Sequence, residues 1–136
     1  MKESENLRSS DANRTVILIA EDELGVARMV KDIFEREGYF ILVASDGENA
    51  LRISRQYSGT IHLLLSDINM PKLNGLELRE QLLKERSEIK VLLMSGGPAP
   101  VGHIPLLRKP FQPKTLLEKV RMMTKSPVLF PTSLRG

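Results

Sequence analysis

The amino-acid sequence predicts an α/β fold in which one parallel five-stranded sheet is covered by helices on both faces. Short apolar runs alternate with amphipathic segments along the chain, which is the pattern of repeated strand–helix units. The runs are apolar at successive positions rather than at every second one, as in strands that are buried on both faces. Residues that start and stop helices separate the two kinds of segment.

The apolar runs are the expected strands. The first, Thr15–Ala20, is rich in β-branched residues, and the third, Ile61–Ser66, is the most uniformly apolar and therefore belongs at the centre of the sheet. A strand order of 2-1-3-4-5 makes these two runs neighbours. The other strands are expected at Tyr39–Ala44, at Lys90–Met94 and in the apolar run before Lys109.

The intervening segments have the spacing of amphipathic helices. In Leu24–Glu37 apolar residues recur at i, i+3, i+4, i+7 and i+8, and Gly38 follows at the usual C′ position. Asp46 is expected to cap the second helix. Leu76–Arg86 and a last helix that begins at Pro113 follow. The predicted apolar stripes are Val26, Met29, Val30, Ile33 and Phe34 in the first helix and Leu116, Leu117, Val120 and Met123 in the last.

One interval is too short for a complete strand–helix unit. Only Gly96–Arg108 separates Ser95 from Lys109, and this stretch must contain the fifth strand. A helix of about 11 residues, a strand of about 5 and two loops need about 20 residues or more. The glycines and prolines of Gly96–Pro100 also oppose a helix. We therefore predict that the fourth helix is absent or reduced to a single turn.

Composition limits the organisation of the chain. With 136 residues, 41% of them hydrophobic, it is expected to form one domain around one core. We expect this domain at residues 14–125, a disordered segment at 1–13 and a tail at 126–136. The absence of cysteine excludes disulfides, thiolate catalysis and sulfur-ligated zinc. Because no apolar run approaches the ~20 residues that span a bilayer, we expect a cytoplasmic protein without membrane contact.

The charge is unevenly distributed along the chain. Residues 1–90 hold 13 Lys and Arg against 16 Asp and Glu, whereas residues 91–136 hold 7 against 1. A basic region of this kind can attract an acidic partner or nucleic acid. We interpret the basic residues as solvated faces of the last helix and the tail, and we expect no binding to nucleic acid.

Charged or hydroxyl side chains stand at the ends of four predicted strands. Glu21 and Asp22 follow the first strand, Asp67 the third, Ser95 the fourth and Lys109 the fifth. The carboxyl ends of parallel strands share one edge, which is where ligands bind in open α/β sheets. We therefore expect these side chains to form a site for a divalent cation and a phosphoryl group, with the Asp67 carboxylate as the phosphoryl acceptor.

Three carboxylates in one place require a cation. At about 4 Å and an effective dielectric constant near 20, each pair of carboxylates repels by roughly 4 kcal/mol. Mg²⁺ suits such a site because it prefers oxygen ligands and often bridges to phosphate oxygens. The expected ligands are the carboxylates of Glu21, Asp22 and Asp67 and the backbone carbonyl of Asn69. Lys109 would offset charge on the transferred group, and the Ser95 hydroxyl would bond a phosphoryl oxygen.

Each of these residues, taken alone, also has a structural explanation. Acidic residues before a helix stabilise its first turn, and an Asp after a strand commonly forms a turn. Their joint occurrence at matching strand ends favours a functional site. His62 and His103 have no metal-ligand spacing, and we assign them no role.

The site residues and their surroundings resemble a known family. The similar motifs are Glu21-Asp22, the stretch Asp67–Gly75, Ser95 and Lys109-Pro110-Phe111, and together they resemble the receiver (response-regulator) domain of two-component signalling. The resemblance covers about residues 14–125. It implies a flavodoxin-like (βα)₅ fold and phosphorylation of Asp67 from a phosphohistidine on a sensor histidine kinase or a phosphotransfer protein.

The resemblance also implies a role for each site residue. Mg²⁺ would be bound by the four ligands named above, Ser95 would be the switch hydroxyl and Lys109 the lysine that contacts the phosphoryl group. The Lys109–Pro110 peptide bond would be cis. Two features depart from the family: Leu106 stands where an aromatic residue is usual, and the fourth helix belongs to the usual output face. The shortened segment is similar to receivers attached to hybrid sensor kinases.

The sequence therefore favours a phosphoacceptor receiver that acts through other molecules. We expect the signal to pass to an unknown downstream protein, by onward phosphotransfer or within a longer polypeptide, and we expect a monomer or weak dimer. Enzymatic turnover beyond its own phosphorylation and slow dephosphorylation is not expected. Asn69 stands where an aspartyl-phosphate phosphohydrolase would need a general acid. The alternative is a pseudo-receiver that binds partners without phosphate.

Overall fold

A parallel sheet of five strands forms the middle layer of the computed structural model, which describes residues 14–98 and 102–125. The strands are β1 (Val16–Ala20), β2 (Phe40–Ala44), β3 (Leu63–Asp67), β4 (Lys90–Ser95) and β5 (Leu106–Arg108). Their order, β2-β1-β3-β4-β5, confirms the predicted sheet and its central strand. The expected disordered segment 1–13 and tail 126–136 lie outside the described residues.

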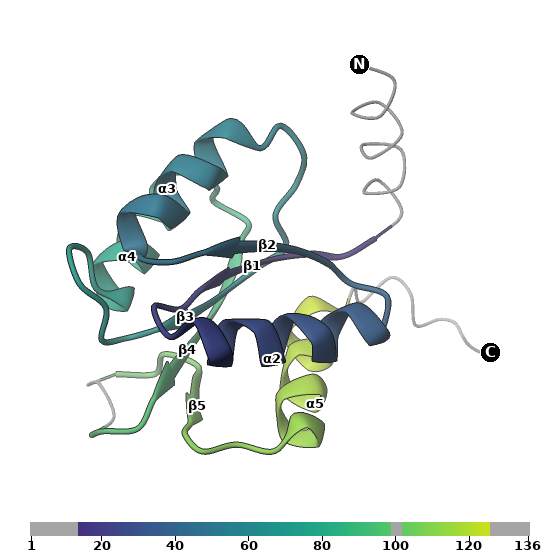
Figure 1. Ribbon diagram of the computed structural model, residues 1–136. Helices are drawn as coiled ribbons and strands as arrows, with labels where there is room; N and C mark the ends of the chain where they lie inside the picture. The colour runs from purple at the N-terminus through teal and green to yellow at the C-terminus, as the bar shows by residue number, and fades with distance from the viewer. Residues whose placement is uncertain (1–13, 99–101, 126–136) are drawn as a thin grey trace.

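Two helices cover each face of the sheet (Figure 1). The helices are α2 (Leu24–Arg36), α3 (Gly47–Gln56), α4 (Gly75–Glu85) and α5 (Pro113–Thr124). Successive strand residues alternate between the two faces, so Ile17 and Ile19 pack with α2 and α5, whereas Leu18 and Ala20 pack with α3 and α4. This alternation explains why the strands are apolar at successive positions. None of the described helices combines the length and apolarity needed to cross a membrane.

Local signals in the sequence set the helix ends. Asp46 Oδ1 accepts a hydrogen bond from the Asn49 amide at 2.8 Å, which confirms the predicted cap of α3. Pro113 is the first residue of α5, as predicted. The predicted stripe of α2 is wrong for Met29, which is 47% exposed. The buried face of α2 is centred on Ala27, Val30 and Phe34, and Met29 lies beside it.

The connection between β4 and β5 lacks a complete helix. Residues 96–98 and 102–105 are not helical, and only the three residues between them lie outside the description. Two helical turns need about seven residues, so this gap cannot hold them. The prediction of an absent or single-turn fourth helix is therefore confirmed.

Arg86, directly after α4, joins the C-terminal ends of α3 and α4. Its guanidinium donates to Ser54 Oγ and to the Ser54 and Tyr57 carbonyls at 2.8 Å, and to the Gly59 carbonyl at 2.9 Å. The last carbonyls of a helix have no partner within the helix, so Arg86 supplies donors for the end of α3. Ser54 is buried, which makes the loss of these bonds expensive.

We expect Arg86→Ala to lower the free energy of unfolding by about 2–4 kcal/mol, because several partly buried acceptors would lose their donor. Arg55→Ala is the matched control: it removes an arginine that pairs with Glu85, but this pair lies in solvent and should contribute much less. Urea denaturation followed by circular dichroism measures both variants. Equal losses would show that Arg86 is not a helix cap.

Candidate functional site

The sheet register brings the predicted site residues to one edge. Strands β1 and β3 pair up to the residues that directly precede Glu21 and Asp67. Glu21 and Asp67 therefore lie side by side. Ser95 ends β4 on the other side of β3, and Lys109 follows the last residue of β5. Four strands thus contribute to one site.

The three carboxylates form a close group. Each of Glu21, Asp22 and Asp67 offers an oxygen, and these oxygens all lie within 4.8 Å of one another. Glu21 is 2% exposed and Asp67 9%, whereas Asp22 is exposed to solvent. The group therefore has a buried side and an open side. An all-oxygen donor set of this kind fits a hard divalent cation such as Mg²⁺.

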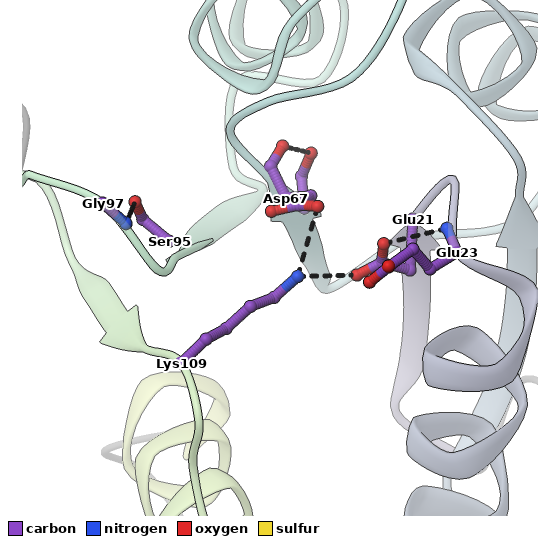
Figure 2. A network of polar contacts seen from close by, with 7 residues as sticks. Glu21, Glu23, Asp67, Ser95, Gly97 and Lys109 are labelled. Carbon is purple, nitrogen blue, oxygen red and sulfur yellow. Dashed lines mark hydrogen bonds and ion pairs between the residues drawn. The ribbon is translucent and has the colours of Figure 1, made fainter.

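Lys109 bridges the two buried carboxylates. Its Nζ lies 3.2 Å from Glu21 Oε1 and 3.2 Å from Asp67 Oδ2, and Figure 2 shows the side chain reaching between them. The sequence predicts a contact of Lys109 with the phosphoryl group but not its contact with Glu21. The two residues are 88 positions apart, so no local pattern could reveal the pair.

The environment shifts the pKa values of Glu21 and Lys109. Burial raises the pKa of the Glu21 carboxyl, and the neighbouring Asp67 charge adds to this effect. A hydrogen bond of 3.0 Å from the Glu23 amide, and the Lys109 ammonium, act in the opposite direction. For Lys109, burial favours the neutral amine, but the charges of Glu21 and Asp67 outweigh burial and raise its pKa. The cluster brings three carboxylates together with one ammonium.

Ser95 is held at the β4 side of the site. It is 3% exposed, and its Oγ accepts a hydrogen bond from the Gly97 amide at 3.1 Å (Figure 2). This contact was not predicted, although the glycines after Ser95 were evident in the sequence. A hydroxyl that accepts one bond can still donate its hydrogen to a second group.

The remaining predicted features differ in outcome. The Lys109–Pro110 peptide is cis, as the family resemblance implied. Leu106 is half-buried and packs against the apolar cluster between the sheet and α3 and α4. Asn69 lies two residues beyond Asp67 and is exposed, and the role of its carbonyl stays a prediction. His62 Nδ1 accepts from the Val16 amide at 2.9 Å, at the opposite end of β1, which is a structural contact.

Comparison with known proteins identifies the family. Residues 17–121 match the family model of the response regulator receiver domain. The chain belongs to this family. The receiver domain is 35% identical over 113 residues to the aerobic respiration control protein ArcA of Escherichia coli (strain K12), an alignment that covers 77% of this chain and 46% of ArcA. It therefore spans about half the length of the curated relatives it matches.

Solved structures show the same fold. The receiver domain of the hybrid histidine kinase CckA is 34% identical, with a TM-score of 0.73, over 81% of this chain and 99% of that one. The response regulator TrrA of Thermotoga maritima, solved in complex with Mg²⁺ and BeF, is 29% identical, with a TM-score of 0.72, over 80% and 98%. Both similarities agree with the flavodoxin-like fold predicted from the sequence.

The family places the acidic cluster in a functional context. Receiver domains are signalling modules that interact with histidine kinases or phosphotransfer proteins. They bind Mg²⁺ at an acidic cluster, and the carboxylates of Glu21, Asp22 and Asp67 form such a cluster in this chain.

We expect Lys109→Met to lower the free energy of unfolding of the metal-free protein by about 1–3 kcal/mol. Without the Lys109 ammonium, Glu21 and Asp67 would share a buried site with no positive charge between them. Lys119→Met, on the exposed side of α5, makes the same chemical change away from the site and should have little effect. Urea denaturation in the presence of EDTA measures both. A Lys109→Met variant as stable as wild type would show that the ammonium does not hold the two carboxylates together.

Proposed function

We propose that this receiver domain accepts a phosphoryl group on Asp67 from a phosphohistidine in a two-component phosphorelay. The observation that carries the proposal is the Lys109 ammonium between Asp67 and Glu21, inside a group of three carboxylates. Phosphoryl transfer asks little covalent help of a protein and depends on positioning and charge neutralisation. A buried carboxylate next to an ammonium and to a potential cation site meets both needs.

Each residue has a defined part in the proposed transfer. An Asp67 carboxylate oxygen forms the new P–O bond while the P–N bond of the phosphohistidine breaks and its electron pair returns to the imidazole. Lys109 neutralises charge on the transferred group, and the Ser95 hydroxyl donates to a phosphoryl oxygen. The burial of Asp67 limits access of water to the acyl phosphate, which slows its hydrolysis.

We propose that Glu21, Asp22, Asp67 and the Asn69 carbonyl hold Mg²⁺. The ion would supply charge neutralisation at the phosphoryl oxygens. The close group of carboxylate oxygens supports this assignment. The related response regulator TrrA was solved in complex with Mg²⁺ and BeF. Asp22, on the open side of the cluster, would receive the ion from solvent.

The proposed partners follow from the chemistry. A sensor histidine kinase or a phosphotransfer protein supplies the phosphoryl group, in the cytoplasm, and a downstream protein reads the phosphorylated state. We propose that residues 14–125 form the functional unit, as a monomer or weak dimer, without binding to nucleic acid or membrane. The similarity to the receiver of a hybrid histidine kinase supports a donor of this class. Turnover on external substrates is not part of the proposal.

Acetyl phosphate with Mg²⁺ should add one phosphoryl group to the wild-type protein and none to Asp67→Asn, because the amide cannot act as the acceptor. Intact-protein mass spectrometry measures the incorporation. Asp32→Asn, the same change at an exposed position of α2, is the control and should be modified like wild type. Equal incorporation in Asp67→Asn and wild type would place the acceptor elsewhere.

Wild type should bind Mg²⁺ in the sub-millimolar to millimolar range, and Asp22→Asn should raise the Kd on the order of tenfold, because one anionic ligand is lost. Isothermal titration calorimetry, or amide chemical shifts, measures the Kd. Asp32→Asn removes one negative charge from α2, the helix that follows Asp22, without touching the cluster. If both variants bind alike, Asp22 is not a ligand. A wild type that does not bind Mg²⁺ would favour the pseudo-receiver alternative.

A further inference from the structure

The segment after the proposed acceptor, residues 68–74, is fixed at its end by a glycine. The Gly75 amide donates to the Ile68 carbonyl at 2.8 Å, which closes the segment into a loop. A Cβ atom on Gly75 would lie 2.3 Å from the Asp67 carbonyl oxygen and 2.9 Å from Ile68 Cα. The first residue of α4 therefore rests directly on the backbone of Asp67, and no side chain fits between them.

A second glycine contacts the same segment from another element. Gly47 is buried and is the first residue of α3, and a Cβ atom there would lie 2.3 Å from the Leu73 carbonyl oxygen and 2.7 Å from Leu73 Cβ. Real Cβ atoms essentially never approach other atoms closer than 3.0 Å. The backbone of Leu73 thus occupies the space that a side chain at position 47 would need.

The contacted turn has an unfavourable backbone conformation. Lys72 has a φ of 71°, and the Leu73 amide donates to the Pro71 carbonyl at 2.8 Å, so the chain reverses over three residues. A non-glycine residue at positive φ persists when surrounding contacts impose it. Two contacts to this turn come from the N-terminal end of α3. The Gly47 backbone lies against Leu73, and Asp46 Oδ2 lies 3.7 Å from the Lys72 ammonium.

We propose that Gly47, together with the Asp46 cap before it, is a positioning residue for the phosphoacceptor site. By admitting the Leu73 backbone, it holds the segment after Asp67 from α3, in addition to the contact that Gly75 makes from α4. That segment carries Asn69, so its position decides whether the Asn69 carbonyl and the Asp67 carboxylate face one cation. This inference rests on the proposed function of the site, and it adds a contact from β2–α3 to a site otherwise built from β1, β3, β4 and β5.

Gly47→Ala should displace Leu73 and with it the segment. We expect its Mg²⁺ Kd to rise about tenfold, the usual effect of losing a residue that orients a metal ligand. The Leu73 and Gly75 amides should exchange with deuterium faster than in wild type when metal is absent, since their acceptors lie within the displaced segment. The exchange measurement needs no bound metal and no phosphorylation.

Gly25→Ala is the matched control. Gly25 is also in the first turn of a helix beside the site, but a Cβ atom there meets nothing within 4 Å. It should keep the wild-type Kd and the wild-type exchange of Leu73. If Gly47→Ala matches Gly25→Ala in both measurements, Gly47 does not position the segment. If wild type binds no Mg²⁺, the proposed function fails, while the exchange of Leu73 still decides the role of Gly47.

A second pair of variants tests the proposal if the Gly47→Ala protein does not fold. Lys72 is exposed, and Lys72→Gly and Lys72→Val both remove the ammonium near Asp46. Glycine adopts positive φ freely, whereas a β-branched residue resists it. We expect Lys72→Val to bind Mg²⁺ about three- to tenfold more weakly than Lys72→Gly. Equal affinities would overturn the proposal that the geometry of this turn sets the site.

Discussion

The crowding of negative charge at the carboxyl edge of the sheet is the constraint on which the site depends. Glu21 follows β1, Asp67 ends the adjacent β3 and both are almost completely buried, so their repulsion is poorly screened by water. Lys109 comes from the end of β5, two strands away from β3, and reaches both carboxylates. One ammonium stands against three carboxylates, and this imbalance is the basis of the cation site that we propose on the open side of the cluster.

The rest of the fold keeps these charges in place. Central β3 is covered on both faces by apolar clusters, so packing holds the strand that carries Asp67 from both sides. Apolar side chains of the segment after Asp67 also pack into the cluster beneath α3 and α4, with Met70 buried in it. The backbone of the segment lies close to Gly47 and Gly75, where no larger side chain would fit. Apolar packing therefore holds the strand before the acceptor, and apolar packing together with close backbone contacts holds the segment after it.

The region beyond Ser95 departs from the usual receiver. Leu106 packs into the apolar cluster at the position where the family commonly has an aromatic ring, and the described parts of the β4–β5 connection contain no helix. A signal carried by rotation of a ring at this position is not available to this chain. The hydrogen bond between Ser95 Oγ and the Gly97 amide links this hydroxyl to the connection that follows β4.

The sequence by itself determined the layers, the strand order, the shortened connection and the five residues that meet at the sheet edge. The layers and the shortened connection follow from periodicity and from caps such as Asp46, which act locally, and the meeting of the site residues follows from the shared direction of strands in a parallel sheet. Only the tertiary structure decided that Lys109 pairs with Glu21, that Met29 faces solvent and that Leu73 rests on Gly47. These three features depend on how side chains and backbone from distant segments pack together, and the spacing of residues along the sequence does not reveal that packing.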